Sequence, residues 1–272
     1  MGRSRGGPPT YPGAVTSSPT VRRAALVLLA AGSGSRTGHR TNKVFLSLAG
    51  RRVFVWSLDA TRVVPDIGPV VLVVREDEQD AAREVLDREA PGRAVRIVVG
   101  GASRHSSEWS ALQALAPDIE RGEVDVVVVH DAARPLSGPA LFRSVVAAAR
   151  EHGGAVPGRL QPALLHRDGL SRRAGEAVAV QTPQAFGAAP LLAAYRAAAD
   201  SGFDGSDTAA CVERFGEGMA IHHVPGTPTN IKITFAEDLF LAEALLARSS
   251  FDIDLLGDAA DPQPARRGQE RR

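Results

Sequence analysis

Two lysines are the first residues in this sequence that suggest chemistry. The 32 basic residues include lysine only at positions 43 and 232, so the other 30 are arginines. The ammonium of lysine is a compact point charge that suits a phosphate or a developing oxyanion, whereas the arginine guanidinium is a broad planar fork. We therefore expect Lys43 and Lys232 to act at an anionic site, with chance retention of either lysine as the alternative.

The residues before Lys43 have the composition of a phosphate-binding turn. Six apolar residues at 24–29 predict a strand that is buried on both faces. Gly32 and Gly34 then let the backbone turn sharply and bring its N–H groups close to an anion, while Arg36 and Lys43 add positive charge. An ordinary strand-to-helix loop is the alternative, but it needs only the glycines.

A second glycine turn follows the apolar stretch 94–99. Gly101 could admit a flat base against the backbone, and Ser107 could hydrogen-bond the edge of that base. The equally open alternative is that Ser106 or Ser107 only caps the next helix. Ligands gather at the carboxyl ends of parallel strands, so this turn is a candidate binding segment.

A carboxylate marks the end of a third apolar run. Asp131 lies just beyond a valine-rich stretch, after His130, where it could hold a metal ion or a substrate hydroxyl, and Arg134 could bind a phosphate. In the alternative interpretation Asp131 and Arg134 pair with each other and fix the loop. We interpret His130 as a packed, hydrogen-bonded group and His105 as a surface residue.

Composition narrows the class of protein. A net charge of +1 with interspersed charges argues against binding to nucleic acid or to an acidic membrane. The single cysteine, Cys211, excludes an internal disulfide and predicts a reducing, cytoplasmic setting, and we expect it to lie in the core. No apolar run approaches the roughly 20 residues that span a bilayer. Arg22-Arg23 and the next apolar residues imitate a secretory signal, but cleavage there would remove the first strand.

Strand and helix patterns alternate along the chain, which predicts an α/β protein with a Rossmann-like, mostly parallel sheet flanked by helices. Residues 21–248 should form this domain, after a flexible leader at 1–20 and before a disordered tail at 249–272. Broken apolar pieces at 155–180 predict a protruding β-arm. Further strands are expected at 69–74, 94–99 and 219–224, and helices at 53–64, 77–89, 107–116, 138–151, 188–200 and 235–248, with one more ending at Arg214.

Two common nucleotide motifs do not fit the first glycine turn. The turn lacks the Walker A pattern. As a dinucleotide fingerprint it keeps Gly32 and Gly34 but has Thr37 in place of the third glycine, and no acidic residue closes a second strand at the expected distance. An NAD-dependent dehydrogenase is therefore the weaker enzymatic interpretation.

Five segments in register resemble the cytidylyltransferase family of 2-C-methyl-D-erythritol 4-phosphate, which has the glycosyltransferase-A-like nucleotidyltransferase fold. The resemblance covers about residues 24–246. The family's A-A-G-x-G-x-R, G-G-x-x-R-x-x-S, H-D-A-A-R-P, T-P-Q and N-I-K-[IV]-T motifs match Ala30 to Arg36, Gly100 to Ser107, His130 to Pro135, Thr182 to Gln184 and Asn230 to Thr234.

The resemblance implies a reaction and a set of roles. CTP and a polyol phosphate would be the substrates, with Mg²⁺ on the triphosphate and two copies paired through the arm. Arg36 and Lys43 would be catalytic, and Asp131 is also the candidate metal ligand. The nucleotide would be bound by Ala30, Ala31, Gly32, Ser33, Gly34, Gly100, Gly101, Arg104 and Ser107, and the acceptor by Asp131, Arg134, Arg173, Thr182 and Lys232.

Three departures from the family pattern lie on the acceptor side. The D-T-x-K of the arm is replaced by residues 159–163, and the family arginine before T-P-Q falls on Ala174, so that Arg173 could serve only with a one-residue shift. The usual D-D-A has become Asp207-Thr208-Ala209. Two alternatives therefore stay open, namely another acceptor such as ribitol 5-phosphate and a nucleotide-binding paralogue without turnover.

Overall fold

The computed structural model describes residues 23–32, 42–161, 164 and 175–255. The expected leader therefore lies outside the described residues. The expectation that the tail begins at 249 is wrong, because the last helix, α7 (Ala236–Leu255), continues past that residue. The rest of the expected tail, 256–272, lies outside the described part of the chain.

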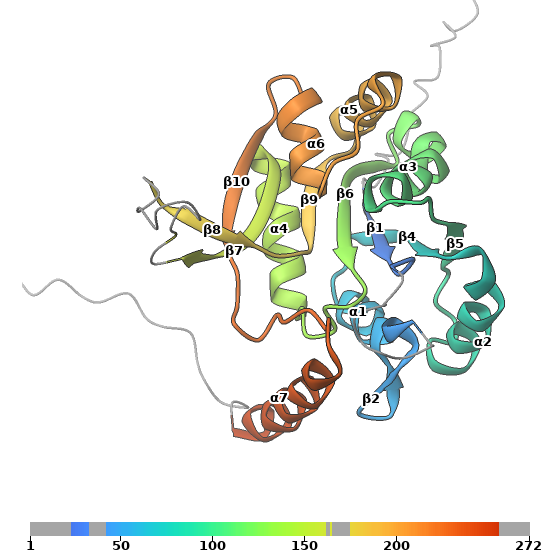
Figure 1. The fold of residues 1–272 in the computed structure, drawn as a ribbon, viewed down its shortest axis with the longest axis vertical. Helices are drawn as coiled ribbons and strands as arrows, with labels where there is room; N and C mark the ends of the chain where they lie inside the picture. The colour runs from blue at the N-terminus through green and yellow to red at the C-terminus, as the bar shows by residue number, and fades with distance from the viewer. Residues whose placement is uncertain (1–22, 33–41, 162–163, 165–174, 256–272) are drawn as a thin grey trace, which may run out of the picture.

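An eight-stranded sheet forms the centre of the described protein, in the order β10-β7-β9-β6-β1-β4-β5, with β8 paired to β7 (Figure 1). Its parallel half consists of β1 (Arg23–Leu29), β4 (Ile67–Val74), β5 (Arg96–Val99) and β6 (Val124–Asp131). The predicted mostly parallel α/β sheet is thus confirmed. One strand of this sheet was not predicted: β9 (Gln184–Gly187) runs antiparallel between β6 and β7.

Helices cover both faces of the sheet. Helices α1 (Val53–Arg62), α2 (Gln79–Glu89) and α4 (Pro139–His152) pack on one face, and α3 (Arg104–Glu120), α5 (Ala188–Ser201) and α6 (Thr208–Phe215) pack on the other. Cys211 on α6 is buried, as expected.

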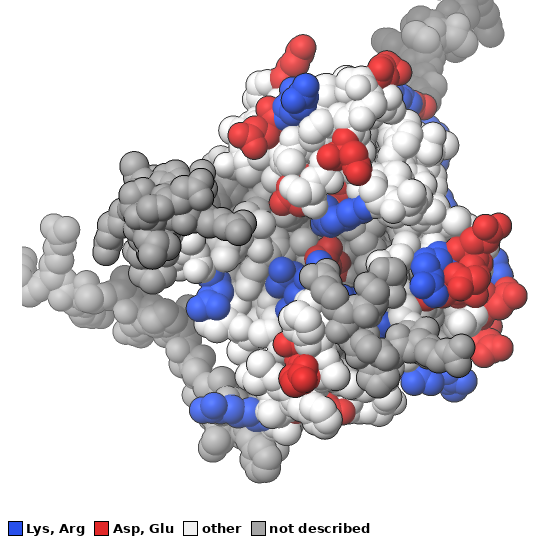
Figure 2. Space-filling model, viewed as in Figure 1, with Lys and Arg blue, Asp and Glu red and all other residues white. Residues whose placement is uncertain are grey.

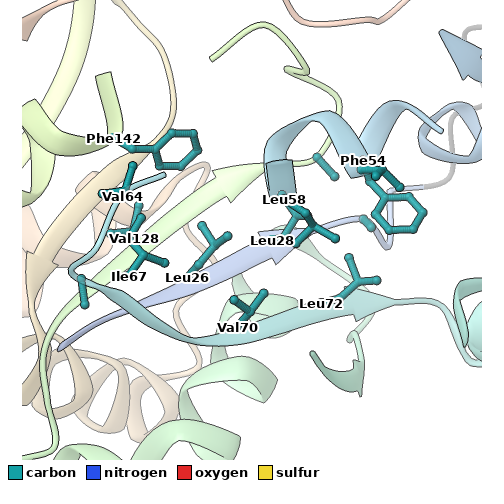
Figure 3. Packing of buried hydrophobic residues seen from close by; sticks show 14 of the residues in the cluster. Leu26, Leu28, Phe54, Leu58, Val64, Ile67, Val70, Leu72, Val128 and Phe142 are labelled. Carbon is teal, nitrogen blue, oxygen red and sulfur yellow. The ribbon is translucent and has the colours of Figure 1, made fainter. Parts of the chain in front are cut away.

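Strand β1 is buried on both sides because its side chains alternate between the two cores. Leu26 and Leu28 join the core beneath α1 and α4 (Figure 3), while Ala25 and Val27 join the core beneath α3 and α5. Fully burying a leucine side chain contributes about 1.5–3 kcal/mol. This two-sided burial fixes the end of β1, and hence the glycine turn that follows it, in the middle of the sheet.

Helix α3 begins at Arg104, three residues earlier than expected. The reason is a capping box: the Ser103 side chain accepts a hydrogen bond from the Ser106 backbone N–H, and the Ser106 hydroxyl accepts one from the Ser103 backbone N–H. The cap therefore places Arg104 and Ser107 on the first turn of α3, beside the end of the sheet.

The predicted arm at 155–180 was given a start that is too early in the sequence. Strand β7 (Gly153–Gln161) starts inside the main sheet, where Ala155 and Val156 are buried between β9 and β10 (Ala220–Pro225). Only residues 158–161 pair with β8 (Ala177–Val180), at the edge of the molecule in Figure 1. Residues 162–163 and 165–174 lie outside the description, so the protrusion itself stays a prediction.

Short elements complete the edge of the sheet where the strands end. They are η2 (Lys43–Phe45), β2 (Ser47–Leu48), β3 (Arg51–Arg52) and η3 (Glu76–Glu78). Leu48 and Val53 pack against Ile233 and Ala242, so that α7 and the segment before it are attached to the region that follows Lys43.

Acidic and basic side chains are interspersed over the face shown in Figure 2, with several acidic ones gathered over α2. This mixture agrees with the small net charge of +1. Among the described helices, none combines the length and the apolar character that a bilayer crossing requires.

Candidate active site

A cavity of about 480 Å³ opens at the carboxyl ends of the parallel strands. Both lysines line it: Lys43 comes from the start of η2 and Lys232 from the segment before α7. The expectation that the two lysines face one site is confirmed. The cavity is also lined by Leu29, Ala30, Ala31, Gly32, Asn42, Val44, Arg75, Gly101, Ala102, Ser103, Arg104, Ser107, Asp131 and Ala133.

The second glycine turn is packed tightly between β1 and α3. A Cβ on Gly100 would lie 2.8 Å from both the Ala31 Cβ and the Ser107 Oγ, and one on Gly101 would collide with Ser106. Packing on α3 thus demands both glycines, whatever ligand they admit. Ser106 completes the capping box of the N-cap residue Ser103, whereas Ser107 lines the cavity and its hydroxyl accepts a hydrogen bond from the Gly101 N–H at 3.2 Å.

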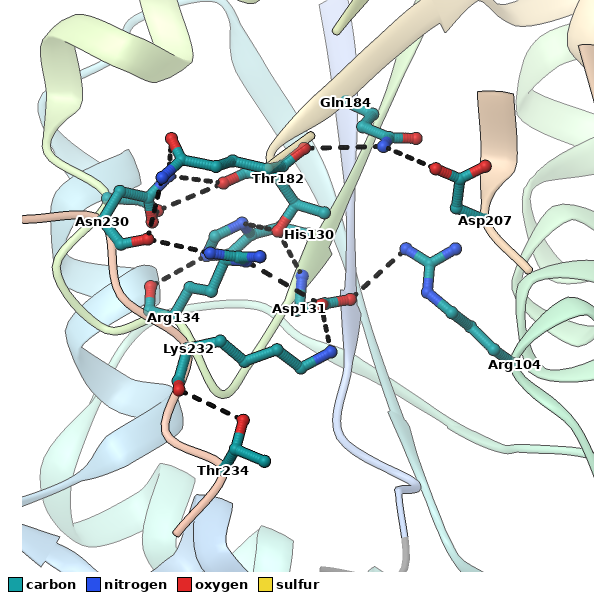
Figure 4. Close-up of polar contacts among 12 residues, drawn as sticks. Arg104, His130, Asp131, Arg134, Thr182, Gln184, Asp207, Asn230, Lys232 and Thr234 are labelled. Atoms are coloured by element: carbon teal, nitrogen blue, oxygen red, sulfur yellow. Dashed lines mark hydrogen bonds and ion pairs between the residues drawn. The ribbon is translucent and has the colours of Figure 1, made fainter. Parts of the chain in front are cut away.

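Asp131 is the centre of the charged groups in the cavity (Figure 4). Its Oδ2 accepts a hydrogen bond from Lys232 Nζ at 2.7 Å and lies 4.0 Å from Arg134 Nε, and its Oδ1 accepts one from Arg104 at 3.3 Å. Burial alone would raise the pKa of Asp131, but Lys232 and Arg104 hold it well below its usual range. The carboxylate is therefore ionised at neutral pH and keeps the cationic groups together.

His130 supports Asp131 from inside the core. Its ring is buried, Nε2 donates to the Arg134 carbonyl at 3.2 Å, and Nδ1 accepts from the Thr182 hydroxyl at 3.0 Å. The Thr182 oxygen in turn accepts the backbone N–H of Asp131 at 3.0 Å. Burial lowers the pKa of His130 to about 4. The interpretation of His130 as a packed, hydrogen-bonded group is confirmed.

The segment that carries Lys232 is attached to the end of β6 by buried polar contacts that the sequence did not reveal as a unit. Asn230 is fully buried, its Nδ2 donates to the Thr182 carbonyl at 2.9 Å, and its Oδ1 accepts from Ser137 at 2.7 Å. Arg134 donates to the Asn230 carbonyl at 2.8 Å. Arg134 therefore holds this segment in place, in addition to lying 4.0 Å from Asp131 as the alternative interpretation expected.

Asn42 performs a similar task beside Lys43, on another side of the cavity, and was also missed. It is buried, and its Nδ2 donates to the Ala30 carbonyl at 2.7 Å and to Glu78 at 3.1 Å. The residue directly before Lys43 is thereby joined to the end of β1. The sequence signal that could have identified it is its place directly before a candidate lysine.

The structure brings most of the predicted site residues together. Ala30, Ala31, Gly32, Lys43, Gly101, Arg104, Ser107, Asp131 and Lys232 line the cavity, whereas Gly100, Arg134 and Thr182 lie in the layer behind it. Ser33, Gly34, Arg36 and Arg173 lie outside the described residues. One expectation is wrong: His105 is buried, stacked on Tyr195 with 4.7 Å between ring centroids, because α3 begins early and turns this residue inward.

The assignment of Asp131 as a magnesium ligand does not fit these contacts. Both of its oxygens already accept hydrogen bonds from cationic side chains. Mg²⁺ needs octahedral oxygen ligands, and the described residues contain no group of three carboxylate, histidine or cysteine side chains that could hold a metal ion. The contacts of Asp131 therefore suit a counter-ion for Lys232 and Arg104 better than a metal ligand.

A cavity lined by Gly32, Gly101 and two ammonium groups at the carboxyl edge of a parallel sheet suits an anionic nucleotide, and a nucleotidyltransferase is the class of protein that this fold and site indicate. The family model described as 2-C-methyl-D-erythritol 4-phosphate cytidylyltransferase matches residues 24–248. The chain belongs to this family.

Related proteins and solved structures support the same family assignment. The protein named 2-C-methyl-D-erythritol 4-phosphate cytidylyltransferase in Pelotomaculum thermopropionicum is 40% identical over 233 residues, 82% of this chain and 94% of the relative. The protein of the same name in Solibacter usitatus is 35% identical over 242 residues, 82% of this chain and 96% of that relative.

Two crystal structures share the fold over most of both chains. The 4-diphosphocytidyl-2C-methyl-D-erythritol synthase of Anaerococcus prevotii superimposes with a TM-score of 0.71 at 27% identity, covering 84% of this chain and all of that one. The 2-C-methyl-D-erythritol 4-phosphate cytidylyltransferase of Thermus thermophilus gives 0.65 at 30% identity, covering 83% and 99%.

Proposed function

We propose that this protein transfers the cytidylyl group of CTP to 2-C-methyl-D-erythritol 4-phosphate and releases pyrophosphate, a step of non-mevalonate isoprenoid synthesis. The observation that carries the proposal is the convergence of Lys43 and Lys232, from distant parts of the chain, on one cavity that also holds Arg104 and Asp131. The identity of the two substrates is inferred from family membership.

The reaction needs two anions to approach each other. An oxygen of the acceptor phosphate attacks the α-phosphorus of CTP, a new phosphorus–oxygen bond forms, and the bond to the bridging oxygen breaks as pyrophosphate leaves with the electron pair. Lys43 neutralises charge on the triphosphate, and Lys232, held by Asp131 at 2.7 Å, binds the acceptor phosphate. Positioning and charge neutralisation account for catalysis, and Arg36 is expected to add to them.

No general base is required. The second pKa of a phosphomonoester is near 6, so the acceptor is already ionised at neutral pH. His130 is fully buried behind Asp131 and does not line the cavity. Because burial lowers its pKa to about 4, it stays neutral and holds the backbone of Asp131 through Thr182.

We propose that Mg²⁺ enters as part of the substrate, bound to the triphosphate of CTP. Mg²⁺ commonly keeps several waters and binds through substrate phosphates. The engagement of both Asp131 oxygens by Lys232 and Arg104 supports this route over a metal site on that carboxylate.

The test is pyrophosphate release from CTP and Mg²⁺ with each acceptor in turn. We expect turnover with 2-C-methyl-D-erythritol 4-phosphate and at least a hundredfold lower kcat/KM with ribitol 5-phosphate. Preference for ribitol 5-phosphate would overturn the proposed acceptor. Binding of CTP in calorimetry without pyrophosphate release from either acceptor would identify a non-catalytic paralogue.

We also propose a homodimer that pairs through β7 and β8, in the cytoplasm. Two apolar side chains on these strands are largely exposed, Leu160 at 61% and Val180 at 51%, and pairing with a second copy would cover them. The single, buried Cys211 suits a reducing compartment. Light scattering should give twice the chain mass, and Leu160→Arg should give the monomer mass; a monomeric wild type would refute the pairing.

A further inference from the structure

Glu108 is a buried carboxylate that the proposed reaction does not use. It lies one helical turn after Arg104 on α3, is 1% exposed, and does not line the cavity. Its Oε1 accepts hydrogen bonds from Arg104 and, at 2.8 Å, from the Thr208 hydroxyl, and its Oε2 accepts one from the Tyr195 hydroxyl. Burying a charge is costly unless it is paired and hydrogen-bonded, so these contacts indicate that the Glu108 carboxylate has a specific role in the protein.

Arg104 is held between two carboxylates. One nitrogen of its guanidinium donates to Glu108, and the other donates to Asp131 Oδ1 at 3.3 Å. Lys232 donates to the second oxygen of the same Asp131 at 2.7 Å. If Glu108 did not hold one edge of Arg104, the whole guanidinium could turn onto Asp131 and compete there with Lys232.

We propose that Glu108 is a positioning residue for the cavity: it holds Arg104 so that Lys232 keeps its place on Asp131 and the guanidinium stays beside the cavity. This inference rests on the proposed function, since it treats Arg104 as a contact of the nucleotide. Glu108 acts through Arg104 and touches neither substrate.

The residue at position 208 supports this role. Thr208 stands where the D-D-A pattern of the resembling family has its second aspartate, and its hydroxyl lies 2.8 Å from Glu108. In this chain α3 supplies a buried carboxylate directly beside position 208 of α6. A carboxylate returned to position 208 should be able to replace that of Glu108.

The experiment compares Glu108→Gln with the wild type. Glutamine keeps the size of the side chain and removes the charge, and losing a charge-assisted hydrogen bond costs about tenfold in an equilibrium constant. We expect the dissociation constant of CTP, measured by calorimetry without acceptor, and the KM for CTP to rise about tenfold. The double variant Glu108→Gln/Thr208→Asp should recover most of this loss.

Tyr195→Phe is the matched control. It removes one donor to Glu108 but leaves Arg104 and the ring stack on His105 in place. We expect a lower melting temperature and a dissociation constant for CTP within twofold of the wild type. Three outcomes would each overturn the role of Glu108. They are CTP binding by Glu108→Gln that equals that of the wild type, a loss of CTP binding in Tyr195→Phe as large as in Glu108→Gln, and failure of Thr208→Asp to restore CTP binding in the double variant.

These outcomes are separate from the test of the proposed function. CTP binding is read without acceptor or turnover, so an inactive wild type would refute the proposed reaction and leave the Glu108 measurement intact. If the wild type turns over and Glu108→Gln binds CTP as well as the wild type does, only the role of Glu108 is refuted.

Discussion

Replacing His130 tests the polar layer behind the site through the pH dependence of stability. The folded protein lowers the pKa of His130 from its ordinary value of 6.5 to about 4 because the ring is buried. The neutral ring also fits its hydrogen bonds, since Nδ1 accepts from Thr182 while Nε2 donates to the Arg134 carbonyl. Protonation would turn Nδ1 into a donor and disrupt the contact that holds Asp131.

The sign and size of the pH effect on the free energy of unfolding follow from proton linkage. Between pH 6.5 and pH 4 the unfolded chain binds a proton at this histidine that the folded chain excludes, so its contribution to stability is present above pH 6.5 and is lost as pH falls. The loss between pH 7 and pH 5 is about 2 kcal/mol for a shift of this size. Asp131 stays ionised throughout, because its pKa lies well below its usual range.

The assay is urea unfolding followed by the fluorescence of Trp56 and Trp109, at pH 7 and at pH 5, for wild type and His130→Asn. We expect the variant to be less stable at pH 7 but to lose about 2 kcal/mol less than the wild type between the two pH values. Subtracting the loss in the variant from the loss in the wild type cancels the other titrating groups, which the two proteins share. An equal loss in both proteins would refute the neutral, buried state of His130.

Three further predictions concern the lysines and the cysteine. Lys43→Ala should lower kcat by about 10² to 10³, the effect of losing one transition-state electrostatic contact, and leave the fold intact; unchanged turnover would contradict its role. Lys232→Ala should raise mainly the KM of the acceptor, and an effect confined to CTP would contradict its placement. Burial raises the pKa of the Cys211 thiol to about 12, so a thiol reagent should modify it only after unfolding, and rapid reaction with the native protein would refute this.

The sequence predicted the parallel half of the sheet and the convergence of the lysines, for one physical reason. Parallel strands that are buried on both faces show as continuous apolar runs, and their carboxyl ends lie along one edge. Residues 24–29 and the valines before Asp131 carry this signal, so the polar groups that follow them had to be neighbours.

Other features depend on contacts between distant segments and left little sign in the local pattern. Strand β9 is four residues long and owes its extended form to pairing with β6 and β7. His105 is polar but buried, because α5 offers it the ring of Tyr195. Glu108, four residues after Arg104, looks like an exposed helical pair until α5 and α6 cover it with Tyr195 and Thr208.

The most direct test of the account follows one oxygen atom through the reaction. The protein is given CTP, Mg²⁺ and 2-C-methyl-D-erythritol 4-phosphate whose phosphate oxygens carry ¹⁸O, and the products are separated and weighed by mass spectrometry. Direct attack within one cationic cavity predicts that the label is retained in the cytidine diphosphate-linked product and is absent from pyrophosphate. Labelled pyrophosphate, or CMP and pyrophosphate formed without a linked product, would contradict it.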